Sequence, residues 1–240
     1  EDNCEALGAK LDKKYLGTIG DFGTYSFFYS HQITSGEGGM VVCKNKKDYE
    51  ILLALRSHGW SRGKNVYAKN AKKYPNLDPR YIFINSGFNL RPTDIQAAIG
   101  RSQFKRLDFF KKTRTMNKNK IINSLVKDKR WKGQFKFVKY SKRINPSYMV
   151  LPILLDIKFI DKKKKFIKLI EEKGLETRPI ISGSFVNQPS TKLYNLNPGN
   201  QKFNGAQKVQ DQGFVIGLST KKIDKKKIDF VTNVLFLIDS

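Results

Sequence analysis

The sequence has 240 residues, which is enough for one large domain or two small ones. Hydrophobic residues make up 39% and charged residues 28%, a balance that is typical of folded chains and excludes a disordered one. No uncharged apolar run approaches the roughly 18 residues of a transmembrane helix, and no signal-peptide pattern follows Glu1, so we expect a soluble protein without a membrane partner.

The formal net charge of +25 is large and has two interpretations. A strongly basic chain can bind nucleic acid, or it can simply carry a lysine-rich surface. The lysines are spread from Lys44 to Lys227 without a nucleic-acid-binding motif or a zinc-finger spacing, so we expect no nucleic-acid partner. Cys4 and Cys43 are too few for a disulfide framework or a metal site, which favours no metal and a reducing, cytoplasmic location.

Short strands, turns and one helix are predicted over the first eighty residues. Gly17–Ser30 is rich in Gly, Thr, Tyr and Phe, which indicates short strands joined by tight turns. Gly36–Gly39 is typical of a turn and precedes the apolar strand Met40–Cys43. Lys47–His58 has the apolar spacing of a helix, whereas the polar stretch Gly59–Pro79 predicts a long loop, a feature that is often functional.

The rest of the chain contains a helix-capping motif, followed by alternating strand and helix patterns. Thr93 and Gln96 have the spacing of a capping box, which predicts a helix from Asp94 through Phe110 and into Lys111–Lys120, linking two structural units. The later elements alternate between strand and helix and imply a small α/β domain: strands at 135–140, 148–155 and 177–181, a helix at 161–173 ended by Gly174, and a final helix at 224–240.

Two runs of residues near the start of the chain carry candidate chemistry. The run Glu1–Ala9 contains Asp2 and Glu5, two carboxylates that by themselves indicate a solvated acidic segment. The run Ser26–Met40 contains His31, whose imidazole can take up and release a proton near neutral pH. A single histidine is nevertheless more often structural than catalytic.

A third run, Gly87–Gly100, joins a turn to the start of the predicted helix. It contains Asn89, which by itself indicates a left-handed turn residue, and Arg91, which by itself indicates a surface residue. A hydroxyl such as that of Ser26, five residues before His31, can form a small anion site with neighbouring backbone N–H groups.

Together, the three runs resemble the signatures of the DegT/StrS family of sugar aminotransferases over roughly residues 1 to 110. Those signatures are Glu-Asp-x-x-(Gln/Glu)-x-x-Gly, Ser-Phe-x-x-x-Lys-x-x-x-x-Gly-(Glu/Asp)-Gly-Gly and Gly-(Tyr/Phe)-Asn-x-Arg. The resemblance implies an α/β fold of the type I transferases that depend on pyridoxal 5'-phosphate (PLP), similar to aspartate aminotransferase. Residues 1–125 would form the C-terminal part of the large PLP-binding domain, with a mixed sheet, and residues 126–240 a small C-terminal α/β domain.

The resemblance also implies roles for the candidate residues. Asp2 would keep the pyridine nitrogen of PLP protonated, Glu5 would lie beside the ring, and Ser26 would bind the cofactor phosphate. Asn89 would reach the phosphate of the partner subunit's cofactor in a homodimer with shared active sites. His31 stands where the family carries the lysine that forms a Schiff base with PLP.

An imidazole cannot form a Schiff base, and no lysine lies between Lys14 and Lys44. Histidine at this position marks the sugar 3-dehydratases of the family. The resemblance therefore implies that pyridoxamine 5'-phosphate (PMP) joins the C4 ketone of a nucleotide-diphosphate 4-keto-6-deoxy sugar, that His31 moves a proton as the C3 hydroxyl leaves, and that glutamate regenerates PMP. Residues 55–62 resemble another dehydratase segment, whereas Gln32 departs from the second histidine that these enzymes often carry.

Two arginines are further candidates for substrate binding. Arg91 lies in the third motif, and Arg178 lies in a segment that resembles the family's small domain and could pair with a phosphate. If Arg178 does not bind a phosphate, it would simply be a solvent-exposed residue that caps its strand. The implied destination of the deoxysugar is lipopolysaccharide O-antigen.

Two other functions stay open. One is a PLP-dependent sugar-nucleotide aminotransferase, and the other is a non-catalytic family member that binds a sugar nucleotide or completes a dimer. The first motif normally lies mid-chain in the family, so we also expect this chain to be a C-terminal fragment that is inactive by itself.

Overall fold

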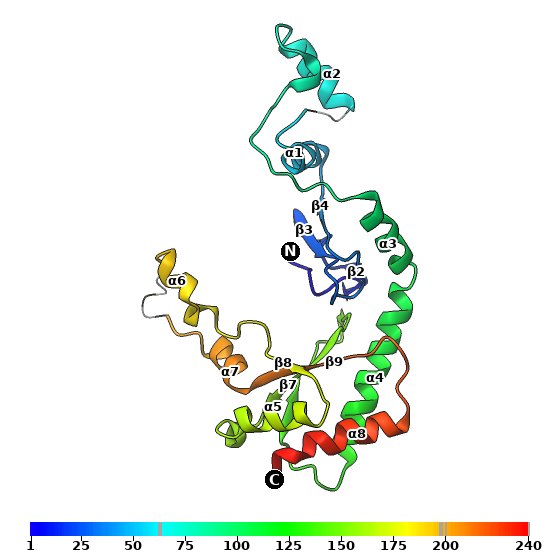
Figure 1. The fold of residues 1–240 in the computed structure, drawn as a ribbon, viewed down its shortest axis with the longest axis vertical. Helices are drawn as coiled ribbons and strands as arrows, with labels where there is room; N and C mark the ends of the chain where they lie inside the picture. Colours follow the sequence, from blue (N-terminus) through cyan, green and yellow to red (C-terminus); the bar gives the residue numbers. More distant parts are fainter. Residues whose placement is uncertain (62–63, 197–198, 200, 240) are drawn as a thin grey trace. The chain divides into compact units, whose positions relative to one another are not determined.

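The computed structural model of the chain forms two compact units (Figure 1). The first unit contains Glu1–Leu107 and Arg143–Ser147, and the second contains Asp108–Lys142 and Tyr148–Ser240. The structure describes residues 1–61, 64–196, 199 and 201–239.

The first unit is built around the hairpin of strands β3 and β4, which pair antiparallel from Phe22 opposite Cys43 to Ser26 opposite Gly39. Side chains alternate along β3, so that Tyr25 is buried while Thr24 and Ser26 share the other, partly exposed face. The unit's elements in chain order are β1 (Lys10–Leu11), β2 (Lys14–Tyr15), β3 (Phe22–Ser26), β4 (Gly39–Cys43), α1 (Lys46–Arg56), α2 (Lys64–Lys73), the 3₁₀ turn η1 (Pro79–Tyr81), α3 (Asp94–Phe104) and β6 (Ile144–Asn145).

A strand within Gly17–Ser30, the strand at Met40–Cys43 and the helix at Lys47–His58 are confirmed as β3, β4 and α1, but the predicted loop Gly59–Pro79 is wrong. It contains α2, a polar helix whose inward side chain is an amide rather than an apolar group. Asn70 is buried and donates hydrogen bonds to the hydroxyl of Ser61 and the carbonyl of Val66, both at 2.9 Å. A buried asparagine gives no apolar period, so the pattern missed this helix.

The capping box at the start of α3 is confirmed. The hydroxyl of Thr93 accepts from the backbone N–H of Gln96 at 3.3 Å, and the Gln96 side chain accepts from the Thr93 N–H at 2.8 Å. The single long helix predicted from Asp94 to Lys120 is wrong, because a tight turn closed by Arg106 N–H donating to the Gln103 carbonyl separates α3 from α4.

The second unit is an antiparallel sheet, in the order β5-β7-β9-β8, covered by helices. The predicted strand at 148–155 and the helix at 161–173 are confirmed. The strand predicted at 135–140 covers only Phe135–Phe137, the strand predicted at 177–181 is only two residues long, and strand β9 was not predicted. The elements are α4 (Leu107–Lys127), β5 (Phe135–Phe137), β7 (Val150–Leu155), η2 (Ile157–Phe159), α5 (Lys163–Glu172), β8 (Thr177–Arg178), η3 (Phe185–Asn187), α6 (Pro189–Leu193), α7 (Asn204–Gln212), β9 (Gly213–Gly217), α8 (Lys225–Leu235) and η4 (Phe236–Asp239).

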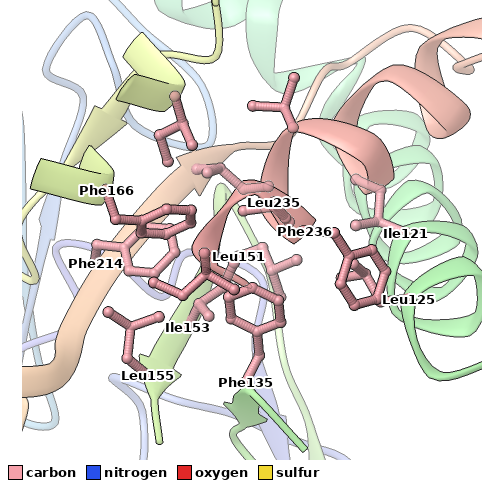
Figure 2. Packing of buried hydrophobic residues seen from close by; sticks show 14 of the residues in the cluster. Ile121, Leu125, Phe135, Leu151, Ile153, Leu155, Phe166, Phe214, Leu235 and Phe236 are labelled. Atoms are coloured by element: carbon pink, nitrogen blue, oxygen red, sulfur yellow. The ribbon is translucent and has the colours of Figure 1, made fainter. Parts of the chain in front are cut away.

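The core of the second unit lies between its sheet and helices α4, α5 and α8 (Figure 2). Alternate residues of β7 point into it, since Leu151, Ile153 and Leu155 are at most 2% exposed. Phe166 of α5 meets Phe214 of β9 edge to face, with ring centroids 6.0 Å apart. The predicted last helix ends as the 3₁₀ turn η4, and Ser240 lies outside the described residues.

The first compact unit ends at Leu107 and regains Arg143–Ser147, and the second begins at Asp108. The second unit includes α4 because Ile121 and Leu125 of this helix belong to its core. The assignment of residues 1–125 and 126–240 to a large and a small domain stays a prediction about the complete fold. None of the helices that the structure describes combines the length and the apolar composition that a bilayer span requires.

Candidate active site

Strand β3 fixes the position of Asp2. Asp2 forms a parallel bridge with Thr24, and backbone hydrogen bonds of 2.9 Å run on either side of it, from Asn3 N–H to the Thr24 carbonyl and from Thr24 N–H to the Glu1 carbonyl. The segment of Asp2 therefore acts as a further strand beside β3, opposite β4, so the sheet is mixed. The Asp2 side chain lies beside the face that carries Thr24 and Ser26.

The Asp2 carboxylate is held in its ionised form. It accepts hydrogen bonds from the Cys4 backbone N–H at 3.1 Å and from the Thr24 hydroxyl at 3.4 Å. Hydrogen bonds from the Cys4 side chain and backbone lower the pKa of Asp2, and the same contact raises the pKa of the Cys4 thiol. Asp2 therefore presents a negative charge beside β3 at neutral pH.

Glu1 organises the turn that leads into β3. Its carboxylate accepts backbone N–H bonds from Gly17 at 2.9 Å, Ile19 at 2.8 Å and Gly20 at 2.6 Å. The bonds from Gly20 and Gly17 lower the pKa of Glu1. Glu1 was not among the predicted site residues. The role of Glu1 could have been inferred from the glycine-rich turn at residues 17–20, because the backbone N–H groups of such a turn can bind a carboxylate.

The turn after β3 carries His31. The Ser26 hydroxyl accepts from the Phe28 N–H at 3.2 Å, and the His31 N–H donates to the Phe28 carbonyl at 3.1 Å. The His31 ring meets the Phe28 ring edge to face at 5.7 Å between centroids. Its Nδ1 is buried and has no hydrogen-bond partner among the described residues.

The third motif is held by the end of α1. Asn89 forms an antiparallel bridge with Ser57, and its neighbours donate from Phe88 N–H to the Leu55 carbonyl at 2.7 Å and from Leu90 N–H to the Arg56 carbonyl at 3.0 Å. The side chains of Asn89 and Arg91 are exposed. The structure thus pairs the third motif with the segment after α1, not with Asp2, Ser26 and His31, and Arg62 of that segment lies outside the described residues.

Arg178 lies in the second unit, at the end of β8. Its guanidinium contacts the Glu176 carboxylate at 3.2 Å, and both side chains are well exposed, so the pair contributes little to stability. Glu171 and Glu176 line the same open hollow as Arg178, and their charges offset its attraction for a phosphate.

The structure therefore places Asp2 beside β3, Ser26 at the end of β3 and His31 on the turn after it. Glu5 is exposed on the loop that follows Asp2, and its carbonyl accepts from the Gln32 side chain. Thr24, which donates to Asp2, and Gln32, which donates to the Glu5 carbonyl, were not among the predicted site residues.

Comparison with known proteins defines the class and then the family. The structure of Escherichia coli GDP-4-keto-6-deoxy-D-mannose-3-dehydratase with bound hydrated PLP has a TM-score of 0.82 and 28% identity, covering 98% of this chain and 59% of that chain. The chain therefore has the type I fold of PLP-dependent sugar-nucleotide enzymes. It belongs to the DegT/DnrJ/EryC1/StrS aminotransferase family, whose model matches residues 1–236, so the predicted family and fold are confirmed.

Curated relatives cover two activities. GDP-4-keto-6-deoxy-D-mannose 3-dehydratase of Escherichia coli O55:H7 is 30% identical over 98% of this chain and 59% of its own length. GDP-perosamine synthase of Escherichia coli O157:H7 is 33% identical over 75% of this chain and 43% of its own length. The chain thus spans about half the length of these relatives.

Proposed function

We propose that the complete protein removes the C3 hydroxyl from a nucleotide-linked 4-keto-6-deoxy sugar, with PMP as cofactor and His31 as the base. The observation that carries the proposal is an imidazole on the turn after β3, where the family motif has its Schiff-base lysine. The sequence contains no lysine between Lys14 and Lys44 that could take the place of His31.

The residues present fit a phosphorylated pyridine cofactor. Asp2 supplies a carboxylate that hydrogen bonds keep ionised, and Ser26 supplies a hydroxyl on the neighbouring strand. The buried Nδ1 of His31 lacks a protein partner among the described residues, and a buried polar atom of this kind suits a bound polar group. A carboxylate, a hydroxyl and an imidazole are thus available on and beside β3.

Each residue then has a defined task. When bound, PMP supplies an amine for the sugar ketone and an electron-accepting ring. Asp2 keeps the ring nitrogen protonated, and Ser26 with the adjacent N–H groups binds the phosphate. An imidazole nitrogen of His31 takes up the proton whose removal accompanies loss of the C3 hydroxyl. Glu5 would lie beside the ring.

The proposal extends to the partners of the enzyme. Asn89 reaches the cofactor phosphate of a partner subunit in a homodimer, and Arg91 and Arg178 bind the nucleotide sugar. Glutamate renews PMP, and the enzyme works in the cytoplasm on a deoxysugar for lipopolysaccharide O-antigen. The side chains of Asn89 and Arg91 are exposed in this chain, which supports these roles because an exposed side chain can contact a partner subunit or a substrate.

The decisive experiment uses the complete protein with PMP, glutamate and GDP-4-keto-6-deoxymannose, and follows the sugar by mass spectrometry. The expected product has lost the C3 oxygen and is released with ammonia. No turnover with this and other nucleotide sugars, despite binding, would instead indicate a non-catalytic family member.

A sugar-nucleotide aminotransferase is the second candidate, because the relative that is 33% identical is a GDP-perosamine synthase. The same assay separates the two functions, since transamination yields an amino sugar that keeps its C3 oxygen. An amino sugar from the unmodified protein would contradict the role given to His31.

Asp2 offers a test of how the chain activates the cofactor that does not involve His31. We expect Asp2→Asn to lower the deoxygenation rate by roughly 100-fold, because a neutral amide no longer holds the ring nitrogen protonated. The measurement is the rate at saturating PMP. Asp21→Asn, at an exposed position with a long 3.9 Å contact to Lys44, is the matched control and is expected to retain activity.

A further inference from the structure

We propose that Gln32 is a positioning residue for His31, an inference that rests on the proposed function. Its buried side-chain amide ties the turn that carries His31 to the loop of Glu5 and to Ser147. In this way it sets where the imidazole stands relative to the cofactor side of β3.

The contacts of Gln32 join three segments that are distant in the sequence. The side chain is 2% exposed, and Nε2 donates to the carbonyls of Glu5 and Ser147, the latter at 3.2 Å and 115 residues away. Both accepting groups are backbone carbonyls of the first unit. A single amide group thus links the Asp2–Glu5 loop, the His31 turn and the segment that ends at Ser147.

Only a donor satisfies this arrangement. An apolar side chain of similar length would fill the space of Gln32 but would leave the two carbonyls without its N–H groups, and unpaired buried polar groups destabilise the arrangement that buries them. The turn would then relax toward solvent, and His31, the preceding residue, would move with it.

The imidazole itself lacks the usual means of orientation. A catalytic histidine is commonly held by a hydrogen bond from its second nitrogen, yet Nδ1 of His31 is buried without a partner among the described residues. The placement of the ring therefore depends on the edge contact with Phe28 and on the anchoring of the turn by Gln32 and Ile33, which is 3% exposed. Gln32 is the polar member of that anchor.

The test compares Gln32→Leu with Gln32→His, which keeps an N–H donor, in the complete protein. We expect Gln32→Leu to lower kcat by roughly 10- to 100-fold with KM nearly unchanged, because a shift of about 1 Å in a reacting group has this effect. Gln32→His is expected to recover most of that loss.

A second readout needs no cofactor. Diethyl pyrocarbonate modifies accessible imidazoles, and in the cofactor-free protein Gln32→Leu is expected to speed modification of His31 at least about threefold, because the turn opens more often. The matched control is Gln134→Leu in the second unit. Gln134 is also fully buried and donates to the Arg130 carbonyl and the Asp239 carboxylate, at 2.8 and 2.7 Å.

The control separates positioning from stability. Gln134→Leu is expected to lower the unfolding midpoint as Gln32→Leu does, but to leave kcat and His31 modification unchanged. Equal kcat for Gln32→Leu and the unmodified enzyme, measured on folded protein, would overturn the inference about Gln32 alone. Retention of deoxygenation by His31→Gln would instead contradict the base that the proposed function assigns, and an amino-sugar product would overturn the proposed function.

Discussion

Replacing His31 with glutamine in the complete protein is expected to lower the rate of C3 deoxygenation by about 10²- to 10⁴-fold, the usual contribution of a positioned acid–base group. Glutamine keeps much of the size of the side chain but cannot take up a proton near neutral pH. The measurement is single-turnover conversion of the keto sugar with PMP-loaded enzyme, which isolates the chemical step from product release.

His31→Lys is the more informative partner of that variant. A lysine on this turn restores the amine that the family motif places there, so deoxygenation is expected to be lost while the cofactor becomes covalently attached, visible as a shift in its absorption. Tyr29→Phe, a conservative change at an exposed position of the same turn, is the control and is expected to remain within about twofold of the unmodified rate.

Retention of deoxygenation by His31→Gln, with a normal circular dichroism spectrum, would contradict the assignment of the base. Loss of activity in Tyr29→Phe as well would mean that the turn tolerates no substitution, and the role of His31 would then rest on the absorption shift of His31→Lys.

The local parts of the site were predictable because each depends on a short pattern. The Thr93 capping box joins residues three positions apart, and the strands β3 and β4 each carry a short pattern of their own, and the structure contains these elements. The bridge between Asp2 and Thr24 joins residues 22 positions apart and is not a local feature. The contact of Gln32 with Ser147 joins residues 115 positions apart, so no local pattern could reveal it.

Strand β9 shows how a weak pattern hides a central element. Only Phe214, Val215 and Ile216 are apolar, between two glycines, which is too short a run for the strand period to show. Yet β9 pairs with both β7 and β8, and Phe214 is 1% exposed. The pairing with β7 and β8, rather than a local pattern, therefore determines that these residues form a strand.

The largest expected effect on stability comes from Gly59→Ala, at the junction of α1 with the segment that carries Asn89. Gly59 has a φ of +82°, and a Cβ built on it would lie 1.6 Å from the backbone carbonyl oxygen of Asn85. We expect a loss of about 3–5 kcal/mol in the free energy of unfolding, because strain at positive φ adds to a clash with backbone. Urea unfolding of the complete protein measures it.

Gly174→Ala is the matched control for this change. Gly174 has a φ of +90°, but a Cβ there would meet nothing within 4 Å, so only the conformational strain of about 1–2 kcal/mol is expected. Equal losses in the two variants would show that the close approach at Gly59 is relieved by small shifts and that φ alone requires the glycine.

The same contact connects stability to the site. The carbonyl of Gly59 accepts from Ile84 N–H at 2.9 Å, and a Cβ on Gly87 would lie 2.1 Å from the nitrogen of Gly59, so the two backbones touch along this stretch. Separating the backbones at Gly59 and Gly87 would displace Asn89, because Asn89 pairs with Ser57 only two residues away along both segments. If Asn89 binds the cofactor phosphate as proposed, Gly59→Ala is expected to weaken PMP retention by the complete protein more than Gly174→Ala does. That result would tie the glycine to the placement of Asn89 as well as to folding.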